Sequence, residues 1–299
     1  MDIATHAGIG LVAAAPFLNS RPELAIGLVA GSVLPDLDAL SRVFGKRAFL
    51  RSHQAWSHAL PVQVAASALA GFSASACGAA GLPLAVGLFA GLAVHTLLDF
   101  SNTLGVKLLA PFSGRRFCLE WVFFIDAAAL MLTAIATSFT LWHFCRNGEV
   151  PVRCAEIFFA TMAIYLSAKG MLRRRAGTLA PEVSTVMPSA LWPWRFFGTT
   201  KCGNCVRLIQ INALSGSRKT LVQHEVLDAV YAGLLADVPE FLLMRELSPA
   251  YHVVSATVTN AGETVVCRDL RTRNFATTFG DLEVLLDTNQ RVMRTTFHV

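Results

Sequence analysis

Long uninterrupted runs of apolar residues, rather than a regular alternation of apolar and polar positions, dominate the first 175 residues. The most extended run, from Ala59 to Val94, has no charged side chain and is divided by Gly81-Leu82-Pro83, which is a turn signal. The first part, and the second part once it is continued past the run to residue 104, are each long enough to cross about 30 Å of hydrocarbon. We therefore expect two antiparallel membrane helices near 60–80 and 84–104, joined by a short turn.

The remaining apolar runs predict three further spans, over 24–38, 121–142 and 154–172. The run from Ile9 to Leu18 contains Pro16 and is too short to cross alone, so it predicts a re-entrant or partly inserted helix. No signal peptide is expected, because no basic segment precedes this run. Residues 1–175 are thus expected to form a mainly α, multi-pass helical membrane bundle with about five spans and a short N-terminal inserted helix.

The pattern changes after Arg173-Arg174-Arg175. Residues 176–188, with two prolines, predict a linker, and 189–299 predict a small soluble α+β domain. Apolar residues at helical spacing predict an amphipathic helix over 222–238, and Pro239 opens a shorter one. Alternation then predicts a small antiparallel sheet within residues 252–298.

Composition agrees with a membrane protein, because 54% of the residues are hydrophobic and only 15% are charged, with a mean hydropathy of +0.52. The net charge of +5 is modest and much of it flanks apolar segments, which does not indicate nucleic-acid binding. Lys and Arg in alternate loops number eleven on one side and three on the other. Basic loops stay in the cytoplasm, so we expect the 41–59 loop, the 105–120 loop and the C-terminal domain there.

Ionisable residues inside the predicted spans gather near that cytoplasmic face. His95 and Asp99 stand four residues apart on one helix face, and Asn102 continues that stripe. Pro35 disfavours a regular helix through Asp36-Leu37-Asp38, and a broken helix end can turn both carboxylates toward one point. Taken alone, His95 and Asp99 would equally fit an interhelical hydrogen bond. Asp36 and Asp38 alone would fit an ordinary solvated helix end.

Histidines supply the other candidate ligands. His53 and His58 bracket Trp56 near the entry to the next span, and His6 falls on the same side of the membrane. Imidazole nitrogens and carboxylate oxygens bind zinc or the harder Mn²⁺ and Mg²⁺. The combined set predicts a site for one or two divalent metal ions, zinc first. Its expected ligands are His6, Asp36, Asp38, His53, His58, His95 and Asp99. Asp126 either completes this site or pairs with a cation such as Arg115, and Glu120 is expected at the interface.

These residues, in this order, resemble the YdjM-type family of bacterial inner-membrane, metal-dependent hydrolases. The resemblance rests on Thr5-His6, Pro35-Asp36-Leu37-Asp38, Ser52-His53, Ser57-His58 and His95-Thr96-Leu97-Leu98-Asp99, followed by Thr103-Leu104-Gly105 and Pro111-Phe112. It implies a cell inner-membrane location and a metal-dependent hydrolase. Gln54 stands where the family is expected to have arginine, which puts a substrate-anion contact at this position in doubt.

The same order is similar, more distantly, to zinc-dependent phospholipases C. That similarity implies hydrolysis of a phosphoester or phospholipid by metal-activated water, with Asp36 or Asp99 as bridging ligand or base. Lys46, Arg47 and Arg51 would attract anionic lipid.

A second class of function remains open, namely a transporter or a metal-binding scaffold whose tail recruits a partner. The lone Cys202-Gly203-Asn204-Cys205 motif is weak evidence for structural zinc or thiol exchange, and reduced cytoplasmic thiols are expected.

Overall fold

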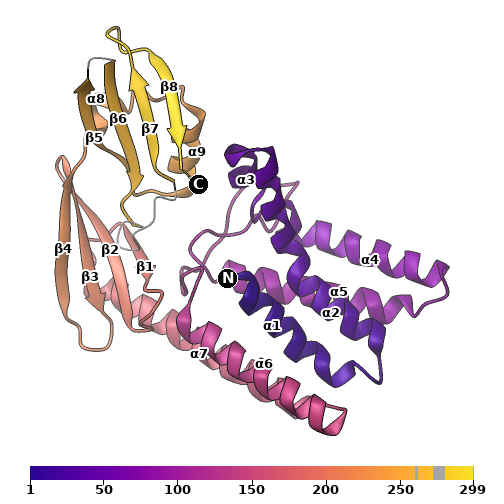
Figure 1. The fold of residues 1–299 in the computed structure, drawn as a ribbon. Helices are drawn as coiled ribbons and strands as arrows, with labels where there is room; N and C mark the ends of the chain where they lie inside the picture. The colour runs from indigo at the N-terminus through magenta and orange to yellow at the C-terminus, as the bar shows by residue number, and fades with distance from the viewer. Residues whose placement is uncertain (260–261, 272–279, 299) are drawn as a thin grey trace. The chain divides into compact units, whose positions relative to one another are not determined.

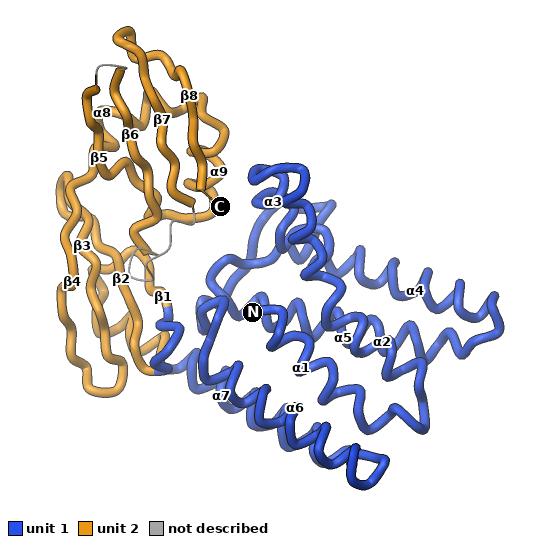
Figure 2. Tube along the Cα trace, viewed as in Figure 1, with its two compact units in different colours: residues 1–171, 188–193 blue, residues 172–187, 194–299 orange. Residues whose placement is uncertain are grey.

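The computed structural model describes residues 1–259, 262–271 and 280–298. The chain forms two compact units (Figure 2). The first unit comprises residues 1–171 with 188–193, and the second comprises 172–187 with 194–299. Residues 188–193 therefore join the first unit although the chain on both sides of them belongs to the second.

The first unit is helical (Figure 1). Its elements are α1 (Ile3–Ala14), η1 (Ala15–Phe17), α2 (Pro22–Val33), η2 (Leu34–Phe44), α3 (Lys46–Ser52), η3 (Trp56–His58), α4 (Leu60–Ala76), α5 (Gly81–Phe100), α6 (Ala127–Asn147) and α7 (Val152–Leu179), the last of which continues into the second unit.

Four helices among the described residues are long and apolar enough to cross a membrane: Pro22–Phe44, Gly81–Phe100, Ala127–Asn147 and Val152–Leu179. The bent pair Lys46–His58 and Leu60–Ala76, with 64° between its parts, would make a fifth span, and Ile3–Phe17 is a shorter apolar helix. The expected bundle of about five spans with a short N-terminal helix is confirmed in this form.

Local signals explain where the helices begin. Proline at the first turn starts α2 and α4, where its missing N–H costs no hydrogen bond. The Asp2 carboxylate accepts from the backbone N–H of Thr5 and caps α1. Asp126 caps α6 by accepting from the N–H of Ala129 at 3.1 Å. The predicted start of this helix at residue 121 is therefore wrong by several residues, because a capping carboxylate was interpreted as a charge within the span.

The bundle is held together by close backbone contact between α2 and α5. Gly27 and Gly31 on α2 face Gly87 and Gly91 on α5. A methyl group placed on Gly27 would lie only 2.6 Å from the carbonyl oxygen of Leu84, so a larger residue does not fit. This arrangement of small residues four apart is typical of helix pairs in membranes.

The span that begins with α2 changes its geometry before it ends. At Leu34 and Pro35 the α-helix gives way to the 3₁₀ helix η2, since proline cannot supply the next backbone donor. This transition turns Asp36 toward α5 at the end of the first span.

Residues 188–193 pack against the helices of the first unit. The N–H of Ala127 donates to the carbonyl of Ala190 at 2.8 Å.

The second unit contains two four-stranded sheets. The first has the order β1 (Thr185–Pro188), β2 (Arg195–Cys202), β3 (Cys205–Asn212), β4 (Arg218–Glu225). The second has the order β5 (Tyr251–Thr259), β6 (Gly262–Asp269), β7 (Leu282–Leu286), β8 (Val292–Phe297). The short helices α8 (Asp228–Tyr231) and α9 (Pro239–Leu247) lie between them in the chain. The expected helical bundle followed by a small α+β domain is confirmed.

Two expectations for this region are wrong in detail. Residues 218–225 form strand β4, antiparallel to β3, so the amphipathic helix predicted over 222–238 shrinks to α8. Hairpin pairing after the turn at Gly216, where φ is 75°, decides this conformation. The expected linker 176–188 contains the end of α7 and strand β1. Cys202 and Cys205 face each other across the β2–β3 turn as free thiols.

Candidate metal centre

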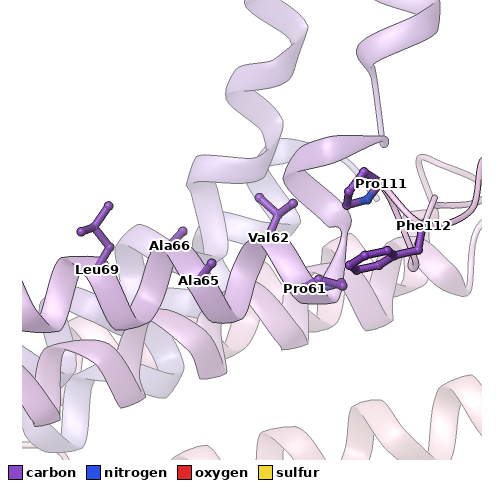
Figure 3. A pocket seen from close by; sticks show the side chains of 7 residues that line it. All are labelled: Pro61, Val62, Ala65, Ala66, Leu69, Pro111 and Phe112. Atoms are coloured by element: carbon purple, nitrogen blue, oxygen red, sulfur yellow. The ribbon is translucent and has the colours of Figure 1, made fainter.

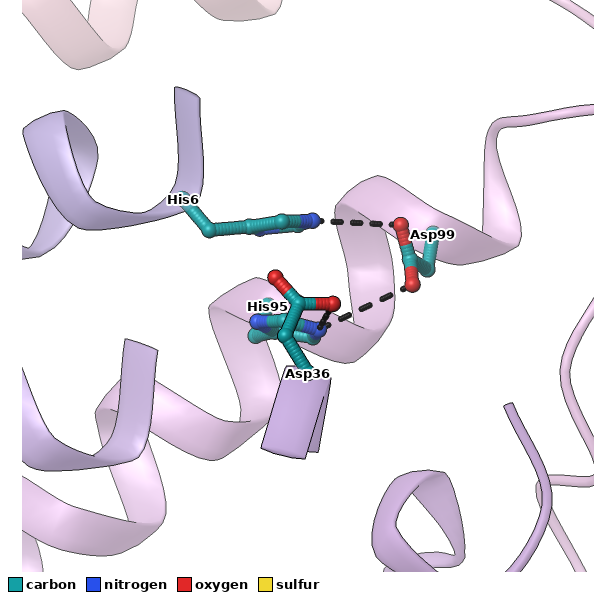
Figure 4. Close-up of side chains that lie close together, drawn as sticks. All are labelled: His6, Asp36, His95 and Asp99. Carbon is teal, nitrogen blue, oxygen red and sulfur yellow. Dashed lines mark hydrogen bonds and ion pairs between the residues drawn. The ribbon is translucent and has the colours of Figure 1, made fainter. Parts of the chain in front are cut away.

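Four side chains from three separate segments meet within the first unit. His6 comes from α1, Asp36 from η2, and His95 and Asp99 from α5 (Figure 4). One ligand atom from each of these residues lies within 4.8 Å of all the others. We call these residues the four-ligand group. His6, His95 and Asp99 are buried, and Asp36 is partly buried.

Neighbouring groups fix the orientation of the two imidazoles, a backbone carbonyl for His95 and side chains for His6. His95 Nδ1 lies 2.8 Å from the carbonyl oxygen of Ser32, which can only accept, so Nδ1 carries the proton and Nε2 presents its lone pair. That Nε2 lies 3.6 Å from Asp36 Oδ1 and 3.6 Å from Asp99 Oδ2. The His6 ring stacks on His95 with centroids 3.6 Å apart, and its Nε2 lies 3.2 Å from Asp99 Oδ1.

His58 faces the same space from the end of η3. Its side chain is fully buried, with Nε2 3.1 Å from His95 Nε2 and 3.0 Å from Asp99 Oδ2. Ser57 Oγ lies 2.9 Å from the other nitrogen, Nδ1. His58 therefore adjoins the four-ligand group, and its Nε2 atom points toward that group.

Asp38 and His53 form an adjoining layer. The Asp38 carboxylate lies 2.7 Å from His53 Nδ1 and accepts from the Gln54 backbone N–H and from Ser57 Oγ, both at 2.8 Å. These contacts occupy both of its oxygens. The structure thus connects all seven predicted residues, with Asp38 and His53 positioned to support the 52–58 segment.

The donor set fits a divalent cation. Imidazole nitrogens and carboxylate oxygens converge in a largely buried space, and Asp36 Oδ2 makes no hydrogen bond within the described residues. Two carboxylates brought together away from water are unfavourable unless a cation neutralises them. His6, Asp36, His95 and Asp99 are the residues that would hold a metal ion.

Comparison with known proteins identifies a family for this chain. The family model described as YdjM inner membrane protein matches residues 1–176. This chain belongs to the YdjM inner membrane protein family. The match covers every residue of the four-ligand group, and together with the apolar helices it supports a membrane location.

The uncharacterized protein YfhP of Bacillus subtilis is 24% identical in an alignment 191 residues long, which covers 56% of this chain and 53% of YfhP. The chain thus spans about half the length of that curated relative. No solved structure matches the chain.

Two further polar side chains of this YdjM family member enter the centre. Gln54 donates from Nε2 to Asp99 Oδ2 at 2.8 Å, and its backbone has a φ of 56°. Asn102 Nδ2 lies 3.3 Å from Asp99 Oδ1. At the position where the YdjM resemblance implies an arginine, Gln54 therefore contacts the carboxylate of Asp99, a candidate metal ligand. The sequence signal for a role of Gln54 at the centre was its position directly after His53.

Asp126 belongs to a different cluster of the YdjM fold. Its Oδ2 lies 3.5 Å from Lys169 Nζ, and Oδ1 accepts from the Tyr165 hydroxyl at 2.5 Å. The Lys169 and Asp126 side chains are 0% and 2% exposed. Pairing of Asp126 with a cation was one of the two expectations, but the partner is Lys169 rather than Arg115. Glu120 lies at the turn before this cluster, where its N–H donates to the Asn102 carbonyl.

Proposed function

We propose that this YdjM family protein is a membrane-bound, metal-dependent hydrolase that acts on phosphoester bonds of lipid-like substrates at the cytoplasmic leaflet. The main support is the four-ligand group, because buried ionisable residues within membrane helices are costly and generally serve function. Zinc suits the two imidazoles and two carboxylates, and Mn²⁺ or Mg²⁺ are the alternatives. The excess of basic residues around 41–59 and 105–120 supports the cytoplasmic side.

The residues of the centre divide into roles. A divalent ion bound there would lower the pKa of water and stabilise negative charge on a phosphoryl oxygen. His6, His95 and Asp99 are held by neighbouring groups and are suited to binding the ion. Asp36 Oδ2 has no hydrogen-bond partner in the described residues, so Asp36, in addition to its place among the four ligands, is suited to accept the proton of the attacking water.

The direct test measures metal and turnover on the same preparations. Wild type, His95→Ala and His143→Ala are purified in detergent, metal is quantified by mass spectrometry, and a panel of phosphodiesters and phospholipids is assayed. His143 is the control because it is a partly buried histidine on α6 that lies outside the four-ligand group and contacts Glu149 and Asn147. We expect metal and turnover in wild type and His143→Ala, and neither in His95→Ala.

Other results would contradict the proposal. Absence of metal from the wild type after reconstitution with zinc and manganese would refute the metal centre. Bound metal without metal-dependent turnover on any substrate would favour a scaffold or transporter.

A further inference from the structure

We infer that an apolar groove on α4 binds one acyl chain of the substrate, so that the substrate class is an anionic, acylated phospholipid. This inference rests on the proposed function and specifies its substrate. The groove is a shallow, open hollow with a volume of about 340 Å³. Its walls are Val62, Ala65, Ala66 and Leu69 of α4 with Pro111 and Phe112 (Figure 3).

The chemistry of the groove matches a hydrocarbon chain. Its lining is almost entirely apolar, and Ala65 and Ala66 leave space because their side chains are short. It lies on the bent pair Lys46–His58 and Leu60–Ala76, which is long and apolar enough to cross the membrane. An acyl chain that enters from the bilayer can therefore reach the groove without crossing water.

The groove begins close in sequence to the segment that carries His58. Pro61, which also lines it, follows His58 by three residues. Two backbone hydrogen bonds tie the opposite wall to the same segment: Leu60 N–H donates to Leu108 O at 3.0 Å, and Lys107 N–H to Gln54 O at 3.1 Å. A lipid with its chain in the groove would thus have its headgroup beside the segment that carries His58.

The charge near this end of the groove suits an anionic headgroup. The loop that supplies Pro111 and Phe112 also carries Lys107, Arg115 and Arg116. The Arg116 guanidinium donates to the carbonyls of Gly105 and His53, both at 3.0 Å, which holds one positive charge next to the 52–58 segment. Cationic residues at the cytoplasmic surface attract anionic lipids. This positive charge would attract the headgroup of an anionic lipid and would not attract that of a neutral bulk lipid.

The first experiment measures binding without turnover. Phosphatidylglycerol with a photoreactive diazirine in one acyl chain is incorporated into phosphatidylcholine vesicles with full-length His95→Ala, and labelled residues are mapped by mass spectrometry. We expect labelling of the groove that excess unlabelled phosphatidylglycerol competes away. Ala66→Phe in this background should reduce groove labelling by about tenfold, because the ring displaces several methylenes. Ala68→Phe, an exposed position of α4 outside the lining, is the matched control.

The second experiment measures chain-length dependence in the active protein. Wild type, Ala66→Phe and Ala68→Phe are assayed on dioleoyl phosphatidylglycerol and on the chain-free headgroup ester glycerophosphoglycerol. Ala66→Phe should lose dioleoyl turnover while retaining activity on the chain-free ester. Retained metal content shows that the variant is folded; if it is lost, Ala65→Leu replaces Ala66→Phe in both experiments.

The outcomes separate the two proposals. Uniform labelling of all lipid-facing helices, without competition by phosphatidylglycerol, would refute the acyl-chain site even if the enzyme is active. Equal loss on both esters by a folded groove variant would do the same. If the wild type hydrolyses no phosphoester, the proposed function fails, and the labelling result alone decides whether a lipid binds this groove.

Discussion

Lys169 and Asp126 form a buried ion pair whose disruption should be among the most destabilising single changes in the first unit. Lys169→Met keeps the length of the side chain and removes its charge. The Asp126 carboxylate would retain hydrogen bonds from Tyr165 and from the N–H of Ala129, but would lose the adjacent ammonium group.

The magnitude follows from the geometry. Two unit charges separated by 3.5 Å attract by about 5 kcal/mol at an effective dielectric constant of about 20. Removing one partner of a buried pair typically costs about 3–5 kcal/mol. We therefore expect Lys169→Met to lower the free energy of unfolding by about 3–5 kcal/mol. In the double variant Lys169→Met/Asp126→Asn, the asparagine side chain still caps α6 and carries no charge. The loss in free energy of unfolding should therefore fall to about 1–2 kcal/mol.

The assay is reversible unfolding in mixed micelles, followed by tryptophan fluorescence as the denaturing detergent increases. Met171→Leu, at a 66% exposed position of the same helix, is the control and should remain near wild type. A double variant as unstable as Lys169→Met, or a stable Lys169→Met, would show that the charge pair does not contribute as described.

Three further predictions concern other parts of the chain. Gly91→Leu should destabilise the bundle by about 3 kcal/mol in the same unfolding assay, because its Cβ would lie 2.9 Å from the backbone nitrogen of Ser32; unchanged stability would refute the close packing of α2 and α5. Asp38→Asn should weaken metal binding by about 10–100-fold without abolishing it, measured by competition with a chelating dye; no change would remove its supporting role. Burial alone would raise the pKa of Asp228, but hydrogen bonds from His252 and a backbone N–H outweigh it, so the pKa is lowered. The Asp228 carboxylate therefore stabilises the folded state. Its contribution is complete above the unfolded pKa of about 3.9 and is lost as the pH falls through the lower folded pKa. Hydrogen exchange of the second unit should show this acid loss in wild type and not in Asp228→Asn.

The parts of the fold that sequence analysis predicted are those that depend on local composition. Apolar runs located the membrane helices, and the i, i+4 spacing of His95 and Asp99 placed both on one face of α5. Strand β4 was missed because its hairpin pairing with β3 overrides the apolar periodicity of the segment itself. The start of α6 was misplaced because capping by Asp126 depends on backbone geometry that spacing does not show.

The same distinction applies to the metal centre. The residue types and the side of the membrane predicted seven converging ligands, of which His6, Asp36, His95 and Asp99 form the four-ligand group. They did not show that Asp38 would pair with His53 beside that group. The contact between Gln54 and Asp99 requires a left-handed backbone conformation at Gln54, which nothing in the local sequence indicates.

The placement of residues 188–193 has a consequence for biogenesis. A ribosome completes α6 and α7 before it reaches Ala190 and Pro193, whose carbonyls accept from the first N–H of α6 and from the Lys169 ammonium. Insertion of the helices into the bilayer and completion of the bundle are therefore separate events in time. Grafting a foreign C-terminal region directly after α7 would leave the inserted helices without these acceptors.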